Sequence, residues 1–336
     1  MTETTEIQLK KLLQNLKQDS KNIDLINSIA IGYFENPSML DENEDLHYFE
    51  LAYKTKNTIK SAHNLSWYLY FEWGEQTRAI IIQKECVELN PKTFYPYYQL
   101  GYMLLDQKQF KEAIPYLEKA NQIENQRDIT HNLGYCYFQL EQFEKSRDIF
   151  SIAVTELDIE NRSLFNLALA EYECKNLEKV KSIADKLIKK IEINQHSTIS
   201  GYEVGLLYFL LNDFEKTTDC LIKQGIDGID LLDWDDLSYS LYQTNKTIWS
   251  KQINKSIQER TEWIEEIKSN HEDWSEYSNQ EKEERLNELR TEIQENENAL
   301  KNVTTKPKPE INKSLLVENC GCLMFDCKRH GNKTND

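Results

Sequence analysis

Small side chains recur along the middle of the chain at an interval that suits a helical hairpin. Ala113 follows Ala79 by 34 residues, Ala168 follows Gly134 by 34, and Gly205 follows Ala168 by 37. Such residues let two antiparallel helices approach closely, and a fixed period of this length is typical of stacked hairpins. The pattern predicts an all-α chain built from repeated helical hairpins.

Two neighbouring units carry the pattern most completely, each with large apolar residues between the small ones. Their characteristic residues are Tyr97, Leu100, Gly101, Leu104, Ala113, Leu117 and Ala120 in the first, and Thr130, Leu133, Gly134, Tyr137, Ser146, Phe150 and Ala153 in the second. Both units resemble the tetratricopeptide repeat, W-x2-L-G-x2-Y followed by A-x3-F. The resemblance implies a right-handed α-solenoid, and it places Trp67 at the site of Gly101 one repeat earlier.

The predicted array covers residues 1–258, with its clearest repeats over 60–225 and degenerate copies at both ends, where terminal repeats act as caps. Residues 259–302 are expected to form a charged helical pair, which either caps the array, the favoured interpretation, or makes a homodimer. Residues 303–319 are expected to be a linker, since each of its prolines removes a backbone donor. A Cys/His tail over 320–336 completes the chain.

Composition limits the classes of partner and compartment. The net charge of −17 argues against nucleic acid and anionic membranes, which both require a basic face. No apolar run approaches the roughly 20 residues that cross a bilayer, and the acidic N-terminus is unlike a signal peptide. Seven cysteines, an odd number, do not suggest a secreted disulfide framework. A cytoplasmic protein with a protein or peptide partner is expected.

The resemblance implies that the first helix of each hairpin lines a concave groove. Asn132 and Asn166 fall at equivalent positions there, and an amide side chain can donate to and accept from an extended peptide backbone at once. The groove would be rich in tyrosine, a common residue of binding surfaces. Alternatively, some of these aromatic residues pack between helices, and an asparagine on a helix faces water. The candidate binding residues are Tyr68, Phe71, Tyr95, Tyr98, Tyr102, His131, Asn132, Tyr135, Phe138, Arg162, Phe165, Asn166, Tyr172, Tyr202 and Phe209.

Four metal-ligating residues cluster in the tail, namely Cys320, Cys322, Cys327 and His330. Thiolates and an imidazole within eleven residues suit one structural zinc in tetrahedral coordination. The C-x-C spacing differs from the usual C-x2-C, so other interpretations remain open. The tail is otherwise a flexible segment with reduced thiols, a site of redox or modification chemistry, or an element that another protein recognises.

No nucleophile–base pair, phosphate loop or paired carboxylate stands out, so enzymatic function is not expected. The sequence favours an adaptor or inhibitor that holds a peptide or protein segment in an aromatic groove. The alternative is a bacterial regulatory or immunity and defence-associated partner protein, whose Cys/His tail binds zinc or is itself recognised.

Overall fold

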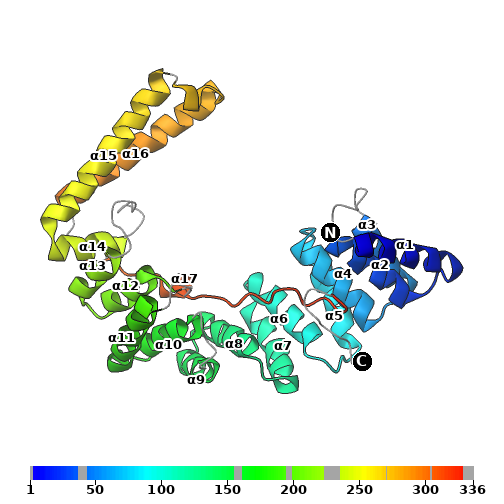
Figure 1. The fold of residues 1–336 in the computed structure, drawn as a ribbon. Helices are drawn as coiled ribbons and strands as arrows, with labels where there is room; N and C mark the ends of the chain where they lie inside the picture. The colour runs from blue at the N-terminus through cyan, green and yellow to red at the C-terminus, as the bar shows by residue number, and fades with distance from the viewer. Residues whose placement is uncertain are drawn as a thin grey trace. The chain divides into compact units, whose positions relative to one another are not determined.

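The computed structural model describes residues 3–36, 44–154, 161–193, 199–222, 235–269, 271–302 and 305–327. It is all-helical over those ranges, and the expected all-α solenoid of hairpins is confirmed (Figure 1). The chain divides into two compact units. The first comprises residues 1–155 and 316–336, and the second comprises residues 156–315.

The first unit holds four hairpins in succession after an N-terminal helix. Within each hairpin the two helices pack against each other, and successive hairpins pack side by side. Its helices are α1 (Glu3–Gln18), α2 (Ile23–Glu35), α3 (Glu44–Thr55), α4 (Ile59–Phe71), α5 (Gln76–Glu88), α6 (Tyr95–Asp106), α7 (Phe110–Ile123), α8 (Arg127–Gln139) and α9 (Phe143–Ala153).

The second unit is also built from helical hairpins and ends in a long helical pair. Its elements are α10 (Arg162–Glu173), α11 (Leu177–Ile193), α12 (Gly201–Leu210), α13 (Phe214–Ile222), α14 (Asp235–Thr244), α15 (Lys246–Ser269), a short 3₁₀ turn η3 (Glu272–Trp274), α16 (Asn279–Asn302) and α17 (Ile311–Ser314). None of the helices in the described ranges is both long and apolar enough to cross a bilayer.

The hairpins α6–α7, α8–α9 and α10–α11 each turn at a residue in the left-handed conformation. Lys108, Glu141 and Lys175 have φ between 58° and 66° at three successive turns. At each turn the following amide donates back across it, as from Gln109 N to the Leu104 carbonyl at 2.8 Å. This bond satisfies a carbonyl that the helix end would otherwise leave unpaired. The repeat is therefore marked at its turns as well as at its helix crossings.

Small residues sit where the helices of a hairpin cross. A Cβ at Gly101 would lie 2.7 Å from the Leu117 side chain, and one at Gly134 would lie 2.9 Å from the Phe150 ring. In the earlier hairpin, Ser66 fills this place and hydrogen-bonds Gln83 of α5. The sequence analysis assigned that place to Trp67. Trp67 is instead the next residue along α4, so its side chain points away from the crossing. Only a small side chain fits at the crossing, so the correct register is one residue earlier.

Helices α15 and α16 form an antiparallel hairpin (Figure 1). Its base packs against α12 and α14 through a cluster of Leu241, Trp249 and Ile253, with Tyr202 beside it. Its far end has a separate core of Ile264, Ile267, Leu286 and Leu289. The base thus covers the last hairpins of the second unit, while the far end is stabilised within the pair.

The proline-containing connection after α16 packs on its own unit. The Lys306 ammonium donates to the Phe209 carbonyl at 3.0 Å and to Asn212 Oδ1 at 2.6 Å. It also lies 4.5 Å from the centre of the Phe209 ring. These contacts hold the start of the connection against the end of α12, although the sequence shows only a linker there.

Candidate functional site

The last described residues of the chain lie against the first helices of three hairpins in the first unit. This C-terminal segment, residues 316–327, runs past α8, α6 and α4 in that order (Figure 1). The contacted surface is called the segment-binding face below. Its main residues are His63, Asn64, Trp67, Tyr98, His131 and Asn132.

Asn132 on α8 binds the segment through its backbone. Its amide nitrogen donates to the Glu318 carbonyl at 2.8 Å, and its amide oxygen accepts from the Glu318 N–H at 2.9 Å. Its second amide hydrogen goes to the Tyr98 hydroxyl at 3.1 Å. Two residues earlier in the segment, the Leu316 carbonyl accepts from His131 Nε2 at 2.8 Å. One His–Asn pair therefore engages two alternate residues of the segment.

A second His–Asn pair on α4 repeats this arrangement. The Asn64 amide donates to the Phe325 carbonyl at 3.1 Å and accepts from the Phe325 N–H at 2.8 Å. His63 Nε2 donates to the Leu323 carbonyl at 2.9 Å. Engagement of alternate residues is the pattern of an extended chain, whose N–H and C=O groups reach one edge at every second residue.

The asparagines of the two pairs bind backbone groups of residues seven positions apart in the segment, Glu318 and Phe325. Seven is an odd number, so an uninterrupted extended strand would turn these two residues to opposite edges. Gly321 lies between them with φ of +60° and corrects the phase. Its carbonyl also accepts from Trp67 Nε1 at 3.2 Å. The left-handed glycine therefore lets one face hold both ends of the segment.

Side chains of the segment fill specific places on the face. The Phe325 ring is fully buried, 4.5 Å from the His63 ring and 5.8 Å from the Tyr95 ring. Glu318 is 4% exposed and pairs with Arg127 at 3.2 Å. These contacts give the face two side-chain contact sites, one for an aromatic ring and one for a carboxylate.

A third contact adds a charge beside the aromatic pocket. The Asp326 carboxylate lies 2.7 Å from the Lys60 ammonium. Lys60 also pairs with Asp24 at 3.0 Å. Partial burial opposes the charge, but the hydrogen bonds that the Lys60 ammonium donates to these carboxylates raise the pKa of Lys60, so the lysine stays charged.

Buried polar side chains beneath the face fix the tautomer of His63. Gln83 Nε2 donates to His63 Nδ1 at 3.1 Å and to the Pro96 carbonyl at 2.8 Å, and Gln83 Oε1 accepts from Gln99 at 2.9 Å. Nδ1 is therefore an acceptor, which leaves the proton on Nε2 for the segment. Burial lowers the pKa of His63 to about 4, so the ring is neutral at ordinary pH.

Tyrosines of α6 surround the middle of the segment. Tyr98 is buried and Tyr102 is half-buried, and both lie near Cys320. Burial raises the pKa of Tyr102 to about 12, and it raises the pKa of Tyr98 well above its usual value. These hydroxyls therefore stay protonated and neutral against the segment.

The cysteines of the tail are distributed along the face. Burial raises the pKa of the Cys320 thiol, and it raises that of Cys322, which lies within hydrogen-bond reach of Cys327, to about 12. Within the described residues no three His, Cys, Asp or Glu side chains are grouped to hold a metal ion. His330 lies outside the described residues, so the zinc site stays a prediction.

Other predicted residues of the first unit line the face less directly. Tyr68 donates to Asp45 at 2.7 Å, Tyr135 packs on Phe110, and Phe138 is buried against Phe143. These contacts lie between helices, as the alternative interpretation of the aromatic residues expects. Phe71 stacks between Trp67 and Tyr102, with ring centres 5.1 and 6.0 Å away.

The remaining predicted residues belong to the second unit. Phe165 and Asn166 are fully buried in α10, and Arg162 is half-buried at its start. The half-buried Tyr172 has the Lys175 ammonium 5.4 Å from its ring centre. Tyr202 packs at the base of the long hairpin, and Phe209 lies beneath Lys306.

Sequence reasoning missed the α4 half of the face, including His63, Asn64 and Trp67. The register that equated Trp67 with Gly101 placed Leu65, rather than Asn64, at the position of Asn132. A direct signal was present: the tripeptide His-Asn-Leu occurs at 63–65 and again at 131–133. Their spacing of 68 residues is twice the repeat period.

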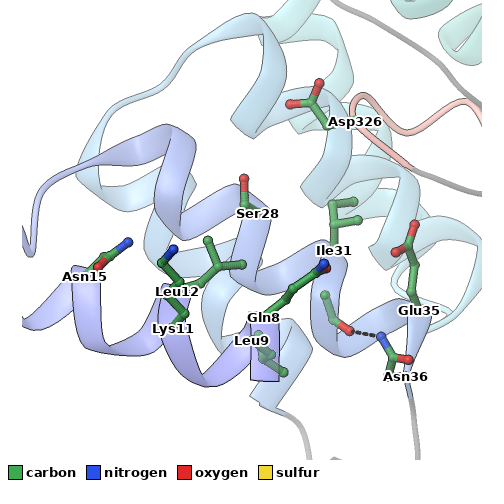
Figure 2. A pocket seen from close by; sticks show the side chains of 11 residues that line it. Gln8, Leu9, Lys11, Leu12, Asn15, Ser28, Ile31, Glu35, Asn36 and Asp326 are labelled. Atoms are coloured by element: carbon green, nitrogen blue, oxygen red, sulfur yellow. Dashed lines mark hydrogen bonds between the residues drawn. The ribbon is translucent and has the colours of Figure 1, made fainter. Parts of the chain in front are cut away.

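A pocket of 440 Å³ adjoins the end of the segment at Asp326 (Figure 2). Helices α1 and α2 form its walls. Its lining combines apolar residues with polar ones, among them Leu9, Leu12, Ile31, Lys11, Asn15 and Glu35. Asn36 is held at its edge by a 2.7 Å hydrogen bond to the Gly32 carbonyl.

Comparisons with known proteins agree with the repeat pattern. Residues 59–93 and 95–127 match the model of the tetratricopeptide repeat. A UDP-N-acetylglucosamine–peptide N-acetylglucosaminyltransferase of Giardia intestinalis is 32% identical over 119 residues, which are 35% of this chain and 8% of that enzyme. The chain thus matches less than a tenth of the length of this relative.

Three solved structures illustrate the similarity of fold. YrrB, a TPR protein with an unusual peptide-binding site, is 14% identical with a TM-score of 0.48 and covers 53% of this chain and 91% of its own. MamA of Desulfovibrio magneticus RS-1 is 24% identical with a TM-score of 0.44, over 51% and 93%. Yeast Tom70 is 14% identical with a TM-score of 0.45, over 88% and 59%.

The family model covers the hairpins α4–α5 and α6–α7, whose crossings carry the small residues of the repeat, and the same hairpin recurs on both sides. Residues 59–93 and 95–127 of the chain are therefore tetratricopeptide repeats.

Proposed function

We propose that this protein is an adaptor that binds an extended segment of a partner polypeptide across α4, α6 and α8. The observation that carries the proposal is the pair of asparagines, each of which both donates to and accepts from one backbone residue of the C-terminal segment. Such contacts recognise an extended backbone whatever its side chains. A partner segment in the same conformation would find the same donors and acceptors.

Binding rather than catalysis is the role that the histidines of the face support. His63 and His131 each direct Nε2 to a backbone carbonyl, and His63 is neutral and fully buried. A general base needs a substrate proton within reach and a pKa near the working pH. The similarity to the Giardia enzyme covers only a small part of that enzyme and is compatible with a shared repeat region.

Other expectations remain predictions. These are the structural zinc at the tail, the homodimer through α15 and α16, the cytoplasmic location and the absence of nucleic-acid and membrane partners. The exposed charged faces of α15 and α16 are compatible with either solvent or a second copy.

The test uses a synthetic, reduced peptide of residues 314–327 as the probe. Full-length protein carrying Phe325→Ala and Glu318→Ala in its own segment, here the open-tail variant, leaves the face intact and loosens the native occupant. We expect this variant to bind the peptide in fluorescence anisotropy. Adding Asn64→Ala and Asn132→Ala should weaken binding at least about thirtyfold, since each of the two removed pairs of hydrogen bonds in a buried site is worth about 1–3 kcal/mol.

Asn254→Ala is the matched control, because Asn254 is exposed on α15 and hydrogen-bonds only locally to the Ser250 carbonyl. It should leave the affinity unchanged. Equal binding by the open-tail variant with and without Asn64 and Asn132 would contradict the proposal.

A further inference from the structure

We infer that the segment-binding face selects one class of ligand, an extended segment with a carboxylate residue seven positions before an aromatic–acidic pair, and that the chain's own C-terminal segment is a resident copy of this ligand. The inference rests on the proposed function and adds the specificity and the competition. A partner must carry this spaced pattern and displace residues 316–327 to bind.

The spacing follows from the rigid placement of the two His–Asn pairs. Asn132 binds the backbone of residue 318, and Asn64 binds that of residue 325. Their helices α8 and α4 are each fixed against the partner helix of the hairpin, at Gly134 and at Ser66. A ligand with one residue more or fewer cannot present its backbone to both amides at once. The distance between the two His–Asn pairs therefore fixes a seven-residue interval in the ligand.

The phase of the ligand adds a second requirement. Between the two contacts the ligand must change which edge of its backbone faces the asparagines. In the chain's own segment Gly321, at φ of +60°, provides this change. A side chain at this position would meet nothing within 4 Å, so its cost is conformational rather than steric. A β-branched residue is disfavoured in the left-handed region, whereas glycine is not.

The side-chain requirements come from charge and shape. Arg127 faces the carboxylate of residue 318, and Lys60 faces that of residue 326. The His63 and Tyr95 rings receive the aromatic side chain of residue 325. In a chain with a net charge of −17, basic residues at both ends of this face favour an acidic ligand.

The resident segment uses the same contacts, which makes it a competitor. It is part of the same chain, so its effective concentration is high and a free ligand binds only by displacing it. The wild-type protein should therefore bind an external ligand more weakly than the open-tail variant does.

The experiment compares four reduced peptides on the full-length open-tail variant by anisotropy. They are residues 314–327, the same peptide with one alanine inserted after Gly321, with Gly321→Val, and with Phe325→Ala. We expect the insertion and Phe325→Ala to weaken binding at least tenfold. Gly321→Val should weaken it about five- to thirtyfold, the equivalent of the penalty for a left-handed residue. Wild-type protein should bind the parent peptide at least tenfold more weakly than the open-tail variant.

The outcomes separate the two proposals. Equal binding of the parent and inserted peptides would contradict the required seven-residue interval while leaving the peptide-binding function intact. Equal affinity of wild type and open-tail variant would overturn the competition. Failure of the open-tail variant to bind any peptide, with an unchanged circular dichroism spectrum, would contradict the proposed function itself.

Hydrogen exchange on the wild-type protein provides a check that requires no variant. The N–H groups of Glu318 and Phe325 donate to buried asparagine oxygens. We expect both amides to be protected, and excess parent peptide to speed their exchange. Protection unaffected by a saturating peptide would contradict displacement.

Discussion

His63 is a buried titratable residue whose imidazole hydrogen-bonds the segment that covers it. The folded-state pKa of about 4 lies below the usual value of 6.5, because burial disfavours the charged ring. Its neutral form donates to the segment and accepts from Gln83, so both ring nitrogens are used. Protonation would add a hydrogen to Nδ1, which would then face the Gln83 amide that donates to this nitrogen in the neutral form.

This arrangement predicts acid lability with a defined sign. Between pH 6.5 and 4 the unfolded chain binds a proton at His63 that the folded protein does not. The contribution to the free energy of unfolding is therefore fully present above about pH 6.5 and is lost as pH falls toward 4, by roughly 3 kcal/mol. Denaturant titrations at pH 7 and pH 4.5 measure it.

His63→Gln is the control, since a glutamine amide can still donate to the Leu323 carbonyl but does not titrate. The difference in stability between the two pH values should be smaller in His63→Gln than in wild type. Equal pH dependence of the two proteins would show that His63 is not the group responsible.

At the scale of elements, each hairpin depends on how closely its two helices cross. Gly134 and Gly205 have the same place in their hairpins, since a hydroxyl twelve residues later donates to the carbonyl of each. They differ in the room around them. A Cβ at Gly134 would lie 2.9 Å from the Phe150 ring, whereas one at Gly205 would have no contact closer than 3.7 Å.

Opposite effects of the same substitution are therefore expected. Gly134→Ala should destabilise the first unit by about 1–3 kcal/mol, because the buried Phe150 ring cannot move aside without strain. Gly205→Ala should stabilise the second unit by up to about 1 kcal/mol through helix propensity. Thermal and denaturant unfolding of both variants measure the effect. Destabilisation of equal size at both positions would contradict the packing argument.

For the whole molecule, the main long-range feature is the return of residues 316–327 to the first unit. Its hydrogen bonds join residues 185 to 261 positions apart in the chain. Loop-closure entropy opposes contacts of such separation, so the buried side chains and backbone pairs of the segment must offset it.

Because the segment is bound to the face, we expect its thiols to be modified slowly. Cys320 and Cys327 are 7% and 1% exposed, and burial raises the pKa of Cys320. Thiolates are the reactive form, so alkylation at pH 8 should follow opening of the segment. Phe325→Ala removes a buried ring worth about 3 kcal/mol or more and should speed alkylation of both thiols about a hundredfold. Mass spectrometry of peptides after timed alkylation measures the rates.

Cys86 is the internal control, since it is fully buried on α5, where its thiol donates to the Ile59 carbonyl at 3.4 Å. Its rate should be unchanged by Phe325→Ala. Unchanged rates at Cys320 and Cys327 would mean that the ring does not hold the segment in place.

The repeat itself was predictable because its signal is local and periodic. Small residues such as Gly101 and Gly134 must recur wherever two helices cross, and the left-handed turns repeat with them. Asn132 was predicted to be a backbone-binding residue from its register and from the resemblance to the repeat family. Asn64 was missed because Trp67 was given the place of Ser66, a shift of one residue that turns a helix face by about 100°.

The sequence by itself therefore determined the helices and their pairing into hairpins, since both follow from spacing over some 34 residues, but it missed His63 and Asn64 on the segment-binding face. Only the tertiary structure decided that the tail lies on that face, with Glu318 and Phe325 at the two His–Asn pairs. The physical reason is that backbone contacts across 185 to 261 residues leave no period in the sequence, because the asparagines bind N–H and C=O groups that every residue carries.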